Sequence, residues 1–94
     1  MALDVSWKTT RNAKEGRWIG SLDIEAPLES LLYHFGQANG VKIDPYGNTR
    51  LSAEQWNRLI VFASQVGYPT DELKQIRAGI PTDNPEGILD LRGD

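Results

Sequence analysis

The stretch GVKIDPYGNTRLSAEQWNRLIVFASQV, residues 40–66, carries the densest structural signals of the chain. Val41 and Ile43 alternate with polar residues, which is typical of a half-buried strand. The tetrapeptide PYGN at residues 45–48 predicts a tight turn, because proline presets φ while glycine and asparagine tolerate positive φ. Residues 49–51 then resume an extended pattern, so the segment predicts a hairpin.

A helix follows this hairpin directly, over residues 52–66. Ser52 stands at its N-cap position, and Gln55 three residues later completes a capping box. Gly67 and Pro69 end the helix, since neither residue favours its continuation. The residues expected on its buried face are Trp56, Leu59, Ile60, Ala63 and Val66.

The first half of the chain predicts two strands and a helix. Apolar and polar residues alternate over residues 2–9 and 17–24, which favours an antiparallel hairpin joined by a polar loop. Trp18 and Leu22 are expected on one face of the second strand, and Gly20 between them indicates a bulge or a close backbone approach. Pro27 opens a helix that ends near Gly40. Its apolar spacing is formed by Leu28, Leu31, Leu32 and Phe35.

The last third predicts a short helix from Thr70 to Gly79 and then a turn-rich segment, TDNPEGILDLRGD. We expect residues 82–94 to form an edge strand or a loose tail. The element order is therefore β-β-α-β-β-α-α. This order predicts an α+β fold over residues 1–94, a single domain in which an antiparallel sheet of two hairpins carries two to three helices on one face.

Composition narrows the class of protein. The chain has 94 residues, no cysteine and a formal net charge of −3. This length suits one hydrophobic core, and disulfides are excluded. No apolar run approaches the roughly 18 to 20 residues of a membrane span, and the first ten residues lack the apolar region of a secretory signal. We therefore expect a cytoplasmic protein that does not bind membranes.

Candidate catalytic and metal-binding residues are sparse. Asp44 and Asn48 resemble the start of a calcium loop, but position twelve of that loop is Gln55, which is not acidic, and a turn alone accounts for the residues. A nucleophilic enzyme would use His34, the single histidine, as its base. His34 lies on the polar side of the first predicted helix. We expect no metal, no cofactor and no enzymatic activity.

Aromatic and charged residues instead favour protein binding. Tyr46 in the turn and Tyr33 on the polar side of a helix are candidate anchors, because tyrosine is enriched in interfaces. Acidic residues near the C-terminus could pair with a basic groove of a partner. A basic cluster at residues 8–17 could contact nucleic acid or an acidic protein, or simply be a solvated loop. The candidate interface residues are Tyr46, Tyr33, Asp83, Glu86, Asp90, Arg11 and Lys14.

A homodimer is a further possibility for a domain of this size. Its candidate patches are Ile19 and the edge formed by Val61 and Phe62.

Residues 44–59, DPYGNTRLSAEQWNRL, resemble a segment of small bacterial proteins of unassigned or immunity-like character. In that segment an Asp-Pro-Tyr-Gly turn, a threonine and an apolar residue precede a helix. The resemblance covers about a sixth of the chain. It implies a bacterial or phage setting and an inhibitor that acts by stoichiometric binding.

The leading prediction is therefore an immunity protein that neutralises a bacterial toxin. One alternative is an inhibitor of a host defence system, encoded by a phage or mobile element. Another is a nucleic-acid accessory protein that uses the basic residues 8–17.

Overall fold

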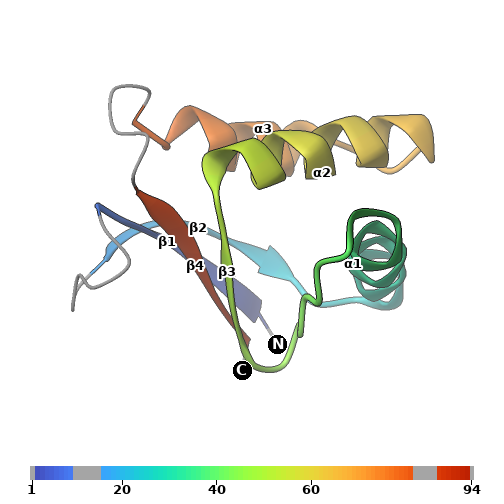
Figure 1. Cartoon of the computed structure of the whole chain (residues 1–94), viewed down its shortest axis with the longest axis horizontal. Helices are drawn as coiled ribbons and strands as arrows, with labels where there is room; N and C mark the ends of the chain where they lie inside the picture. Colours follow the sequence, from blue (N-terminus) through green and yellow to red (C-terminus); the bar gives the residue numbers. More distant parts are fainter. Residues whose placement is uncertain (1, 10–15, 82–86, 94) are drawn as a thin grey trace.

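The computed structural model describes residues 2–9, 16–81 and 87–93. The predicted α+β class is confirmed (Figure 1). None of the helices in these ranges is long and apolar enough to cross a bilayer. The elements are β1 (Ala2–Lys8), β2 (Arg17–Asp23), α1 (Ala26–Asn39), β3 (Asn48–Leu51), α2 (Ala53–Gln65), α3 (Asp71–Ala78) and β4 (Ile88–Gly93).

The four strands form one antiparallel sheet in the order β2-β1-β4-β3. Strand β4 therefore lies inside the sheet, between β1 and β3. For residues 88–93 the expectation of an edge strand or a loose tail is wrong, whereas residues 82–86 and 94 lie outside the described residues. The physical reason is the apolar run of β4, where Leu89 lies opposite Trp7 on one side and Leu51 on the other.

The second predicted hairpin is not formed. The described structure has no strand at residues 41–44, and β3 pairs with β4. The predicted turn itself is present: Asp44 Oδ1 accepts the Tyr46 N–H at 2.9 Å, and the Asp44 N–H donates to Thr49 Oγ1 at 3.1 Å. The Gly93 N–H at the end of β4 then donates to the Gly47 carbonyl at 2.8 Å. The turn thus places β3, which follows it, beside β4.

The core lies between the sheet and the three helices, which Figure 1 shows on one side of the sheet, α2 and α3 side by side and α1 apart from them. Trp56 of α2 is fully buried, and its indole N–H donates to the Leu73 carbonyl of α3 at 3.0 Å. This hydrogen bond satisfies a buried donor and ties the two helices together. The capping box of Ser52 and Gln55 is confirmed.

Two predicted core positions differ in the structure. Val66 is 58% exposed, because α2 ends at Gln65 and Val66 is its C-cap residue. Ile60 is half-buried.

A bulge in β2 is confirmed near Gly20. Val5 pairs with Gly20 but Ser6 pairs with Trp18, so Ile19 is an extra residue that reverses the alternation of side chains. The close neighbour of Gly20 is a side chain and not a backbone, since a Cβ there would lie 3.3 Å from Ile76 Cγ1. The expectation that Trp18 shares a face with Leu22 is wrong, since Trp18 points with Ser6 to the outer face.

The position of β4 predicts a strong contrast between two truncations. Leu89→Ala should lower the free energy of unfolding by about 2–5 kcal/mol, because Leu89 is fully buried and a cavity would remain. Val66→Ala, an apolar truncation on the surface, should change it by less than about 0.5 kcal/mol. Denaturant unfolding followed by circular dichroism measures both. Equal effects would contradict the interior placement of β4.

Candidate functional site

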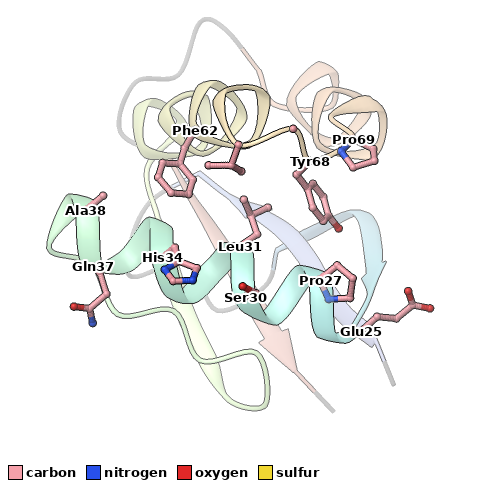
Figure 2. A pocket seen from close by; sticks show the side chains of 12 residues that line it. Glu25, Pro27, Ser30, Leu31, His34, Gln37, Ala38, Phe62, Tyr68 and Pro69 are labelled. Carbon is pink, nitrogen blue, oxygen red and sulfur yellow. The ribbon is translucent and has the colours of Figure 1, made fainter.

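A groove of about 1050 Å³ runs between α1 and the connection from α2 to α3 (Figure 2). Helices α1 and α2 touch at the rings of Phe35 and Phe62, whose centroids are 5.9 Å apart at an interplanar angle of 66°. The groove lies beside this edge-on contact. The lining residues are Glu25, Pro27, Ser30, Leu31, His34, Gln37, Ala38, Phe62, Val66, Gly67, Tyr68 and Pro69.

The chain between α2 and α3 places one aromatic wall of this groove. Gly67 adopts a φ of 81°, a left-handed conformation that ends the helix without a Cβ clash. The Tyr68 N–H then donates to the Ala63 carbonyl at 2.8 Å, and Pro69 cannot continue a helix. As a result the Tyr68 ring projects from the connection toward the side of α1 that carries Pro27 and Leu31 (Figure 2).

Carboxylates of Glu72 and Glu25 make the electrostatic potential around Tyr68 negative. Burial raises the pKa of the Tyr68 hydroxyl, and the negative charges of Glu72 and Glu25 raise it further. The hydroxyl is therefore a protonated hydrogen-bond donor at neutral pH. No lysine or arginine is among the described residues that line the groove. Its surface thus combines apolar walls with a nearby negative potential.

The two tyrosines predicted as anchors do not line this groove. Tyr46 is half exposed, and its hydroxyl donates to a carboxylate oxygen of Glu29 on α1. That hydrogen bond raises the pKa of Tyr46. Tyr33 is exposed, and its ring meets the ring of His34 edge-on at a centroid distance of 5.4 Å. Their role as interface anchors stays a prediction.

Of the charged candidate interface residues, the structure describes Asp90. Asp90 is only 4% exposed, with its carboxylate 3.4 Å from Lys8 Nζ and 3.1 Å from Arg92 Nε. The expectation of an acidic side chain on a tail or edge is therefore wrong for Asp90, because β4 is an interior strand. The remaining charged candidates, Asp83, Glu86, Arg11 and Lys14, lie outside the described residues.

Two cations of the basic cluster at residues 8–17 contact other parts of the fold. Lys8 is buried against Asp90, and the Arg17 guanidinium donates to the Gly79 carbonyl at 2.8 Å. Both flanking cations thus have partners in the fold itself. This reduces the positive charge that the cluster can offer to phosphate.

The sequence did contain signals for the groove. Phe62 widens the apolar surface of its helix beyond the main stripe, and Tyr68, between Gly67 and Pro69, suits a loop residue that covers the core. The spacing of α1 from α2 was not deducible, because it depends on how both helices pack on the sheet.

Within the described ranges, no group of three or more histidine or acidic side chains is arranged to hold a metal ion.

Comparison of the chain with protein-family models, with curated proteins and with solved structures found no match. The resemblance of residues 44–59 to immunity-like proteins accordingly stays a prediction.

The raised pKa of Tyr68 predicts a pH dependence of stability. The folded state holds the proton of the Tyr68 hydroxyl more tightly than the unfolded state does. The contribution of this group to the free energy of unfolding is therefore fully present below the ordinary tyrosine pKa of about 10, and it is lost as the pH rises through the raised pKa of the folded state. The Tyr68→Phe variant should lose less stability between about pH 8 and pH 11 than the parent protein. Denaturant unfolding at both pH values, with Tyr33→Phe as the control, measures this. An equal loss in Tyr68→Phe and the parent would show that Tyr68 does not contribute.

Proposed function

We propose that this protein is a non-catalytic inhibitor that binds another protein stoichiometrically, as an immunity protein binds a bacterial toxin. The observation that carries the proposal is the groove between α1 and the α2–α3 connection. Among its lining residues, Val66 is exposed, and Phe62 and Tyr68 are half-buried. Apolar groups in a concave surface gain free energy when a partner covers them, at about 25 cal/mol per Å².

The shape of the groove suits side chains of a protein partner. Interfaces concentrate their binding energy in a few aromatic or aliphatic anchors that enter such recesses, surrounded by polar contacts. Ser30, His34 and Gln37 supply polar groups along the α1 wall, and the protonated Tyr68 hydroxyl supplies a donor on the opposite wall. The mild negative potential favours a partner surface that carries positive charge.

The biological setting of the proposal comes from residues 44–59, which resemble immunity-like bacterial proteins. An inhibitor of a defence system, encoded by a phage or mobile element, would use the same groove in the same manner. The identity of the bound protein separates the two settings.

Blocking the groove should abolish partner binding. Ser30 is exposed on the α1 wall, so Ser30→Trp would fill the groove without removing a core side chain. Immobilised parent protein should retain one bacterial protein from lysate at near-equal molar amount, and Ser30→Trp should retain at least about tenfold less. Quantitative mass spectrometry of the bound fraction measures both. The isolated partner's activity should fall to zero at one equivalent of inhibitor.

A matched control is Ser64→Trp, which places the same bulk at an exposed α2 position outside the lining residues. This variant should bind like the parent. Recovery of no stoichiometric partner, or equal recovery by Ser30→Trp, would refute the proposal.

A further inference from the structure

The sheet face opposite the helices carries an ordered pattern of side chains. The strand register places outward residues in rows that cross all four strands in the order β2-β1-β4-β3. One row reads Trp18, Ser6, Asp90 and Arg50. The next row reads Ser21, Asp4, Arg92 and Asn48.

Trp18 is the exceptional residue on this face. Its side chain is 61% exposed, whereas Trp7 and Trp56 are buried in the core. The bulge at Ile19 turns it outward, as described above. A large aromatic ring held in this way on an open sheet loses apolar contact that a partner surface could supply.

Lys8 on β1 and Asp90 on β4 are paired with each other on this face, and outside that pair its two halves carry opposite charges. Asp4 on β1 lies directly opposite Arg92 on β4 in the register, and Arg50 lies exposed on the far strand β3. At the centre, Asp90 is already paired with Lys8 and Arg92. Covering the face would therefore leave no uncompensated charge at Asp90, which removes the main cost of burying it.

We propose that a second copy of this chain binds this face, sheet against sheet, about a two-fold axis that runs parallel to the strands between β1 and β4. This rotation keeps each row at its own level and places β1 over β4 of the second copy and β2 over its β3. Asp4 then faces Arg92 of the second copy, and Trp18 faces Arg50 of the second copy. Each contact occurs twice, as symmetry requires.

Both contacts are chemically matched. Asp4 and Arg92 form an ion pair between the chains, and the Arg50 guanidinium stacks on the Trp18 indole, the ring that binds cations best. Sheets packed face to face lie about 10 Å apart, a spacing that side chains of this length bridge. A partner with a face of one charge would oppose a like charge either at Asp4 or at Arg92 and Arg50. The pattern thus fits a second copy, and the inference is independent of the proposed groove.

Charge reversal tests the arrangement on the full chain. Sedimentation velocity over concentrations up to about 1 mM should show the parent protein at twice its monomer mass. Asp4→Lys and Arg92→Glu, each alone, should raise the dissociation constant at least about tenfold, because like charges then meet across the interface. An equimolar mixture of the two variants should restore a dimer, since each chain now supplies the charge that the other lacks.

The mixture separates contacts between chains from contacts within one chain, because no intramolecular repair can occur on mixing. Arg58→Glu reverses a charge on the exposed side of α2 and should leave the mass unchanged. Trp18→Ser, an exposed change that preserves the core, should also weaken the dimer. A monomer at every concentration, or a dimer indifferent to Asp4→Lys and Arg92→Glu, would overturn the proposal.

Discussion

The pairing of β4 between β1 and β3 is the constraint on which the rest of the structure depends. The last strand of the chain joins the first strand to the third, so the sheet exists as one layer only when both ladders form. Leu89 and Leu91 complete the inner face beneath the helices. The same strand places Asp90 against Lys8 on the outer face. The position of β4 between β1 and β3 thus organises the core on one face of the sheet and a pattern of charges on the other.

The groove is a consequence of how the helices share that sheet. Trp56 bonds to the carbonyl of Leu73, which holds α2 and α3 together. α1 contacts α2 through the edge-on rings of Phe35 and Phe62, and Tyr68 lies across the groove from α1 (Figure 2). The groove therefore lies where the packing of the helices is incomplete. This arrangement keeps the core closed while Phe62 and Tyr68 stay half-buried and Val66 exposed at its edge.

Local features were predicted well because their causes are local. The capping box at Ser52 and the turn after Asp44 each depend on residues a few positions apart, and each is present. The bulge near Gly20 is also present, but it depends on the pairing of β2 with β1. Of the candidate interface residues that the structure describes, Tyr33 and Tyr46 were correctly placed on the surface, whereas Asp90 was not. Phe62 was a candidate for a dimer edge, but the sequence does not show that it lines a groove with Tyr68.

The sequence by itself determined the α+β class, the helices and the strands β1, β2 and β3, since periodicity and capping encode them within short windows. Only the tertiary structure decided that β3 pairs with β4 and that residues 88–93 lie inside the sheet. Strand partners are chosen by burial across the whole molecule, and an apolar strand gains most where both of its edges and one face are covered. For the same reason the outward turn of Trp18 and the groove beside Tyr68 emerge only when all the elements are packed together.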